Sequence, residues 1–204
     1  MPNVNAPFGL RPYSMKSGAP YNGAVRTYYV PASNPTALYI GDPLVTVTNS
    51  SDGNGIQTVA IATAGDSNLI LGAFQGITNN AGTTVITLQQ TQTPYLASGQ
   101  AAYVVVSDDP DLLYAVQEDG SGGASMVSGA SGRNANLLSG TGNTFSGQSG
   151  WTMQTASLAT TAAHQLHIIQ LLQSPLSDNA VGQYARWLVK INQGIHPFNV
   201  ALGV

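Results

Sequence analysis

The sequence predicts an all-β protein, an antiparallel β-sandwich or barrel (jelly-roll-like topologies included), with an extended N-terminal arm. After residue 23, segments rich in β-branched and aromatic residues recur roughly every ten residues, and clusters of Gly, Pro, Asn, Asp and Ser separate them. Before residue 23, proline and glycine dominate instead. Short strands at such regular spacing are typical of sandwiches and barrels.

Residues 1–23 form the predicted arm, which contains four prolines and three glycines. Proline removes a backbone donor and restricts the residue before it, so we expect an extended segment and neither a helix nor a central strand. The arm also carries large apolar side chains that need a surface to pack on: Phe8, Leu10, Tyr13 and Tyr21. That surface is either the chain's own β domain or a neighbouring subunit, and the sequence leaves both open.

Residues 24–120 are predicted to hold the barrel or sandwich. Residues 69–77 are apolar on both faces and predict a buried strand, in which Gly72 and Gly76 indicate a bulge or a close backbone approach. A turn is expected at 41–43 and a hairpin-type connection at 50–55. The strands are expected at 25–30, 38–40, 44–48, 56–62, 69–77, 83–89, 102–106 and 112–117.

Residues 121–150 shift in composition to Gly, Ser, Ala, Asn and Thr. A flexible linker is one interpretation of this composition. We favour an ordered excursion that joins β elements, because Phe145, Trp151 and Met153 need burial.

Residues 151–204 are expected to supply the C-terminal strands that complete the β fold. The Ala and Leu content of 162–172 is compatible with a helix. We favour a strand, because its expected partner, 184–192, alternates between apolar and basic positions around Trp187. The tail from residue 194 ends in alternating apolar residues and is expected to pair in a sheet, either this chain's or a neighbour's.

The composition excludes several classes of function. Charged residues make up 7% of the chain and the formal net charge is −3, so six Lys and Arg residues cannot form a stripe that binds nucleic acid. There is no cysteine, which removes disulfides, thiolate metal sites and thiol nucleophiles. We expect no signal peptide and no membrane span, and synthesis in a cytoplasm. So little surface charge fits a protein packed against copies of itself or a large partner.

No motif predicts catalysis or a cofactor. The acidic residues at 108–111 do not have the spacing of a calcium loop and are interpreted as a solvated turn. His164 and His167 would lie on opposite faces of a strand, so a structural role is favoured over a metal site. Ser146-Gly147-Gln148-Ser149-Gly150 is the nearest approach to a nucleophile elbow and lacks its first glycine. We therefore expect no enzyme activity, no metal and no cofactor.

Several phrases together resemble a family of tailed-bacteriophage virion proteins described as capsid cement or head decoration proteins. The similarity runs nearly end to end, and no single phrase in it is a catalytic or ligand signature. Its phrases are Asn5 to Pro12, Gly18 to Gly23, Tyr28 to Ala32, Gly41 to Val45, Ile70 to Gly72, Asp108 to Asp111, Gln117 to Gly120, Asn134 to Leu137 and Tyr184 to Asn192.

This resemblance implies a β-rich structural protein that binds the outer surface of an assembled capsid and strengthens the shell against internal pressure. Its implied partners are the major capsid protein and further copies of itself, as a homo-dimer or homo-trimer, with no nucleic acid and no membrane. The candidate capsid- or subunit-contact residues are then Phe8, Leu10, Tyr13 and Tyr21. A carbohydrate- or receptor-binding β module on the virion surface is the alternative, since the aromatic residues are numerous enough for a sugar platform.

Overall fold

The computed structural model describes residues 3–78, 85–86, 94–121, 126–172 and 178–200. It confirms the all-β class, since the only helical elements in those ranges are single turns of 3-10 helix. The strands are β1 (Arg11–Met15), β2 (Arg26–Val30), β3 (Pro43–Ser51), β4 (Gln57–Ile61), β5 (Gly72–Thr78), β6 (Val85–Ile86), β7 (Ala102–Ser107), β8 (Leu112–Gln117), β9 (Asn134–Ala135), β10 (Leu137–Leu138), β11 (Thr152–Met153), β12 (Leu166–Leu171) and β13 (Arg186–Ile191). The 3-10 turns are η3 (Ser128–Ala130), η4 (Thr155–Ser157) and η5 (Pro197–Asn199).

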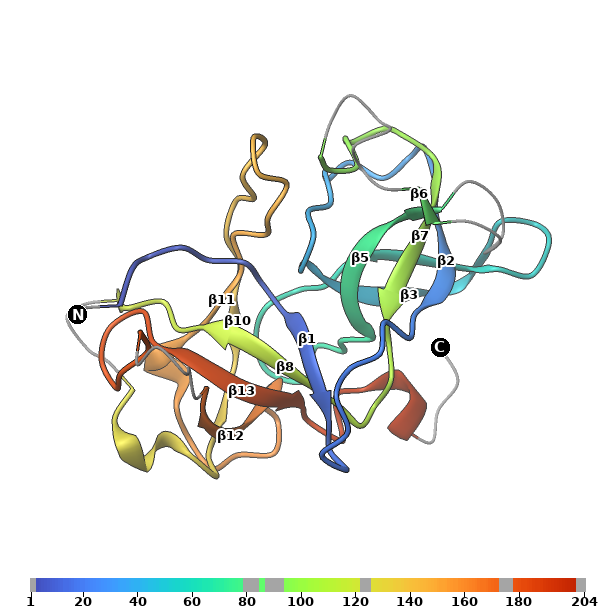
Figure 1. Ribbon diagram of the computed structural model, residues 1–204. Coiled ribbons are helices and arrows are strands. Elements are labelled where there is room, and N and C mark those ends of the chain that lie inside the picture. Colours follow the sequence, from blue (N-terminus) through green and yellow to red (C-terminus); the bar gives the residue numbers. More distant parts are fainter. Residues whose placement is uncertain (1–2, 79–84, 87–93, 122–125, 173–177, 201–204) are drawn as a thin grey trace.

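One sheet closes on itself as a small barrel, at the upper right of Figure 1. Its strand order is β3-β4-β2-β7-β5-β6, and a further pairing of β3 with β5 joins the two sides. All its pairs are antiparallel except β2 with β4, which meet in parallel at Tyr29 and Thr58. The register of β5 on β7 shifts between Phe74 and Gly76, which confirms the predicted bulge.

The barrel is filled by apolar side chains at alternating strand positions, as the period of two requires. Tyr28 and Val30 of β2 and Val104 and Val106 of β7 are buried in one cluster with Phe74 of β5. Leu38 and Leu96, joined by backbone hydrogen bonds of 2.8 and 3.0 Å, also belong to this cluster.

The second sheet is antiparallel throughout, with the order β1-β8-β13-β12-β9. The strand β12 confirms the choice of strand over helix, although it covers only Leu166–Leu171 of the expected range. Trp187 and Val189 of β13 are buried beside Tyr114 and Val116 of β8. Arg186 and Lys190 of β13 are half-buried, while Trp187, Val189 and Ile191 are fully buried, in line with the predicted alternation.

The two cores are continuous, which makes the arrangement sandwich-like. Ile61, at the end of β4, packs against both the barrel core and the sheet core. Ala62, Ile70 and Ala73 from the barrel side are buried in the sheet's own cluster. The strand β8 follows barrel strand β7 after a tight turn and enters the other sheet.

Part of the arm is an edge strand. Residues Arg11–Met15 pair with β8 at the margin of the five-stranded sheet, and the register shifts between Pro12 and Ser14. An edge is the position in a sheet that tolerates proline, because one row of backbone donors has no partner strand there. The arm therefore lies on its own chain, the first of the two alternatives that the sequence left open.

Three local expectations need correction or lie partly outside the described residues. Phe145 is 94% exposed, although Trp151 and Met153 are buried as expected. The described part of the tail forms η5 with His196 as its cap and does not pair as a strand, while 201–204 lie outside the described residues. Of the expected strand at 83–89, only Val85–Ile86 is described, as β6.

Candidate functional site

A tight turn at residues 39–42 ties together parts of the chain that are distant in sequence. The backbone N–H of Leu10 donates to Gly41 O at 2.8 Å, and that of Gly41 donates to Phe74 O at 2.9 Å. Ile40 N–H donates to Gly147 O, and Ser149 N–H donates to Ile40 O, both at 2.9 Å. The arm, the barrel wall and the 139–150 segment therefore share one attachment point.

Glycine is required where the arm meets this turn. Gly9 and Gly41 have φ of +69° and +94°, the left-handed region that other L-residues rarely adopt. A Cβ on Gly9 would lie 2.2 Å from Gly41 O and 2.6 Å from Ser149 Oγ. A side chain at this position would push the arm away from the turn.

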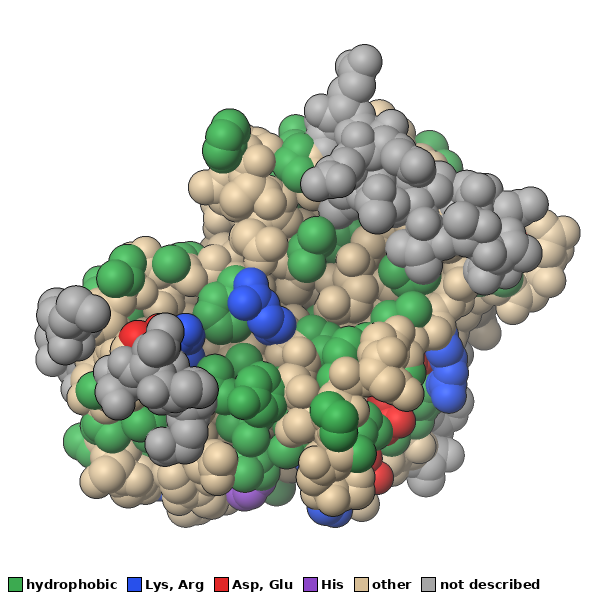
Figure 2. Space-filling model, viewed as in Figure 1, with side chains coloured by type: hydrophobic (Ala, Val, Ile, Leu, Met, Phe, Trp, Pro, Cys, Tyr) green, Lys and Arg blue, Asp and Glu red, His purple; other side chains and the backbone are tan. Residues whose placement is uncertain are grey.

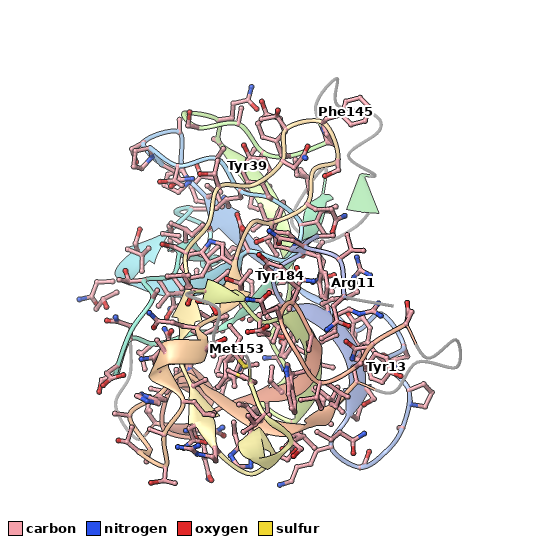
Figure 3. All side chains as sticks on the ribbon, turned by 90° about the vertical axis from the view of Figure 1, so that its left-hand side faces the viewer. Arg11, Tyr13, Tyr39, Phe145, Met153 and Tyr184 are labelled. Carbon is pink, nitrogen blue, oxygen red and sulfur yellow. The ribbon has the colours of Figure 1, made fainter. Side chains whose placement is uncertain are left out.

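Residues 139–150, hereafter the Phe145 loop, project from the body as an ordered element (Figures 1 and 3). Asn143 closes its tip, because its Oδ1 accepts from Phe145 N–H at 2.9 Å and from Ser146 N–H at 3.0 Å. Asn143 N–H donates to Gln148 O, and Gly147 N–H donates to Asn143 O. These bonds hold the Phe145 side chain, 94% exposed, at the end of the loop.

The arm is fixed on both sides of Phe8. Ahead of it, Gln117 exchanges side-chain hydrogen bonds with the backbone of Val4 and Ala6 at 2.8 and 2.9 Å. After it, the Arg11 guanidinium lies 4.7 Å from the centre of the Phe8 ring, a cation–π contact. The arm keeps Phe8 half-buried and Arg11 exposed.

The four candidate contact residues do not form one cluster. Leu10 is 0% exposed and belongs to the sheet core, so it anchors the arm to its own chain. Tyr21 is half-buried against that core and donates from its hydroxyl to Ala24 O at 3.0 Å. Tyr13 is 49% exposed. Figure 3 shows Tyr13 and Phe145 at opposite ends of one side of the molecule, with Arg11 between them.

Two hollows flank the arm. One, of about 350 Å³, lies toward the sheet and is lined by Val4, Phe8, Arg11, Tyr184 and Arg186 among others. The other, of about 540 Å³, lies toward the Phe145 loop, and Phe8 and Arg11 line it as well. Figure 2 shows basic side chains near the start of β1 bordered by hydrophobic ones.

A separate pocket of about 540 Å³ lies at the base of the Phe145 loop, between the barrel and residues 139–142. Tyr39 lines it and stacks on Tyr95 with ring centres 4.9 Å apart, and Trp151 forms part of its wall. Asp42 also borders it and is 1% exposed, with Oδ2 accepting from Tyr39 N–H at 2.8 Å. Burial raises the pKa of Asp42 to about 6.

The acidic turn at 108–111 is not fully solvated, which corrects the sequence-based interpretation. Asp108 is 4% exposed and accepts a hydrogen bond of 2.6 Å from the Tyr28 hydroxyl. Arg26 lies 3.4 Å from the same carboxylate oxygen. Burial, together with this bond to Asp108, raises the pKa of Tyr28 well above its usual range.

The histidines have separate partners. His164 Nδ1 lies 2.7 Å from Asp66 Oδ1, and His167 Nδ1 lies 2.8 Å from Asn134 Oδ1. Within the described ranges, no three His, Asp or Glu side chains gather in a group that could hold a metal ion.

The comparisons with family models, curated proteins and solved structures find nothing that matches this chain. None of the helices in the described part of the chain is long and apolar enough to span a membrane.

Proposed function

We propose that this chain is a structural protein of a tailed-bacteriophage virion, a cement or decoration subunit that binds the outer surface of the capsid, and not an enzyme. Its partners would be the major capsid protein and copies of itself, as a homo-dimer or homo-trimer. The end-to-end resemblance of the sequence supports the family, and the charge-poor, β-rich body supports a role in protein contact.

The Phe145 loop is the observation that carries the proposal. Single exposed apolar residues are common on protein surfaces. Phe145 differs because five hydrogen bonds within the loop and two to Ile40 order the segment that presents it. Ordering a loop around an exposed aromatic has an entropic cost, and burial of that ring in a partner would offset it.

The mechanism is passive. A subunit that binds the assembled shell and not its dissociated parts stabilises the shell by mass action. Many copies on one shell, each with a modest interface, would add up to a large effect on the whole particle. The arm is already bonded to the 39–42 turn in the free chain. Little conformational entropy is therefore lost when the subunit binds the capsid.

Sedimentation with bare capsids tests the proposal. The wild-type protein should pellet with capsids that lack it, and Phe145→Ala should bind at least tenfold more weakly, because a buried aromatic anchor contributes about 2 kcal/mol or more. Its unfolding free energy should change by less than about 0.5 kcal/mol, since the ring contacts little in the free chain.

Phe198→Ala is the matched control. Phe198 is also partly exposed, at 46%, but it stacks against Arg26 near the barrel and away from the Phe145 loop. The Phe198→Ala variant should bind capsids as tightly as the wild type. Failure of the wild-type protein to associate with capsids would refute the proposal.

A carbohydrate-binding module is the second candidate, and the pocket beside Tyr39 favours it. Tyr39 and Trp151 both line this pocket, and an aromatic ring gives a sugar an apolar surface to pack against. A glycan array should then show binding that Tyr39→Ala abolishes and Phe145→Ala leaves intact. Capsid binding without any glycan signal would exclude this candidate.

A further inference from the structure

We infer that the two hollows beside Phe8 form one docking groove for an acidic segment of the partner protein, whose carboxylate pairs with Arg11. This inference rests on the proposed function, because the capsid protein is the partner it concerns. Its support is the lack of an ion-pair partner for Arg11 and the residues around that side chain, and it does not depend on the Phe145 loop.

Arg11 is one of few cations without an anion. The chain has six Lys and Arg residues. Three of them pair with aspartates, namely Arg26 with Asp108, Arg186 with Asp178 and Lys190 with Asp111, at N···O distances of 3.4, 2.8 and 3.0 Å. Arg133 is half-buried and donates to Leu158 O at 3.1 Å.

Among the described residues, Arg11, Lys16 and Arg133 therefore have no ion pair, and Arg133 already donates to a backbone carbonyl. Only Arg11 borders the hollows, and it borders both of them. Its guanidinium lies over the Phe8 ring, a contact that restrains the side chain and leaves the N–H groups at its edge to donate. Arg11 is therefore a preorganised donor in the middle of the groove.

The chemistry of the groove selects the ligand. A planar guanidinium matches the two oxygens of a carboxylate in a bidentate pair. The second guanidinium that borders the groove, Arg186, is already bound to Asp178, so the groove offers one free positive charge and not the several that a nucleic acid or other polyanion needs.

Arg186 and Asp178, which both line the hollow toward the sheet, pair with each other, and the rest of the lining is apolar or neutral. Val4, Phe8 and Tyr184 line the hollow toward the sheet, and Pro7 lines the hollow toward the loop. The best occupant is therefore an Asp or Glu side chain with apolar neighbours, in a segment that crosses over the arm. Figure 3 places Arg11 beside Tyr184 on the same side as Phe145, so one partner surface could reach both.

Three variants test this inference against bare capsids. Arg11→Gln removes the charge and should weaken capsid binding by about tenfold to a hundredfold, the range of a charge-assisted hydrogen-bonded pair. Binding of this variant should also depend less on salt. Lys16→Gln removes one charge from the same edge of the molecule, outside the groove, and should bind within about twofold of the wild type.

The third variant, Arg11→Lys, identifies the partner group. A carbodiimide couples an amine to a carboxylate only where the two are in contact, with loss of one water that the reagent takes up. Mass spectrometry of the Arg11→Lys complex should find an amide between residue 11 and an Asp or Glu of the capsid protein. Wild-type protein, whose guanidinium does not react, should give no such link.

The outcomes separate the two proposals. If the wild type binds capsids and Arg11→Gln binds equally well, the groove inference is wrong and the cement function stands. A link from residue 11 only to a second copy of this chain also overturns it, since the occupant is then the chain itself. If the wild type does not bind capsids at all, the proposed function fails and the inference fails with it.

Discussion

At the scale of single residues, Asp42 makes the stability of the molecule depend on pH. Burial raises its pKa from 3.8 to about 6 in the folded chain. The stability that goes with the neutral carboxyl is present below pH about 4 and is lost as the pH rises to about 6, because folding must then bury a charge. A difference of about two units between the pKa of the folded and the unfolded chain corresponds to roughly 3 kcal/mol of stability.

Asp42→Asn should therefore gain stability relative to the wild type as the pH rises from 4 to 7, and the gain should level off above that. The amide oxygen can still accept from Tyr39 N–H. Urea denaturation of both proteins at several pH values measures the difference. Asp109→Asn, at an exposed position in the turn before β8, controls for the loss of one negative charge. Parallel stability curves for wild type and Asp42→Asn would contradict this account.

Gly9 and Gly18 allow backbone strain and steric overlap to be separated. Both have positive φ, but a Cβ on Gly18 has no atom within 4 Å, whereas one on Gly9 overlaps Gly41 O. Gly18→Ala should cost about 1 kcal/mol of stability, from strain alone. Gly9→Ala should cost at least about 2 kcal/mol more and increase hydrogen exchange at Leu10 N–H. Equal costs for the two variants would show that the arm does not need its contact with the turn.

Residue-scale prediction from the sequence succeeds for the core and fails for surface aromatics. Trp151 and Met153 were expected to be buried and are, because large apolar side chains seldom find another place. The same argument fails for Phe145, since Asn143 Oδ1 accepts from the backbone N–H groups of Phe145 and Ser146 and the turn that this forms places the ring in solvent. Nothing in the local sequence says whether a Gly- and Ser-rich turn faces inward or outward.

At the scale of elements, alternation and turn chemistry predict most of the strands. The segments that became β2, β4, β5, β7 and β13 have periodic apolar positions and clear boundaries, and they lie where expected. The parallel contact of β2 with β4 and the closure of β3 on β5 have no local signal, because they depend on pairings across the chain.

The candidate groove could be predicted only in part. The sequence identified the arm and Phe8, but it predicted no partner for Arg11 and no role for 139–150 in forming a wall. Both depend on the 39–42 turn, which holds the arm and the Phe145 loop together through backbone atoms. Contacts between backbone atoms cannot be predicted from the side chains, and the only sequence signal for these is the glycine at positions 9 and 41.

One buried amide side chain, that of Gln165, joins the barrel to the five-stranded sheet. Gln165 is 0% exposed, and its Oε1 accepts from Gly65 N–H and Leu137 N–H at 3.1 and 3.2 Å. Its Nε2 donates to Thr63 O and Asn68 O at 2.8 and 3.2 Å. This side chain links the 63–68 loop of the barrel to the start of β12.

Gln165→Leu should cost at least about 3 kcal/mol, because it leaves four backbone groups buried without partners. Thermal or urea unfolding gives the total loss. Gln170→Leu, at an exposed position in β12, the strand that follows Gln165, should change stability by less than about 0.5 kcal/mol. A small effect at Gln165 would mean that water replaces the lost amide.

At the scale of the whole molecule, the barrel and the sheet should unfold together. Their cores meet at Ile61, and three barrel-side residues are buried in the sheet's cluster, so neither can open without exposing the other. We expect tryptophan fluorescence, which reports on Trp151 and Trp187 of the sheet side, and far-ultraviolet circular dichroism to give coincident transitions. Separate midpoints would show two independent units.

The place of β13 at the centre of its sheet has a consequence for synthesis. It comes last of the described strands, yet it alone joins the β1–β8 pair to the β12–β9 pair. Arg11 of β1 pairs with Ala115 of β8, which is synthesised roughly 5 to 20 seconds later at about 5 to 20 residues per second. The barrel strands β2 to β7 emerge meanwhile and have their partners within reach. The barrel of a nascent chain would therefore be nearly complete while the five-stranded sheet still lacks its central strand, β13.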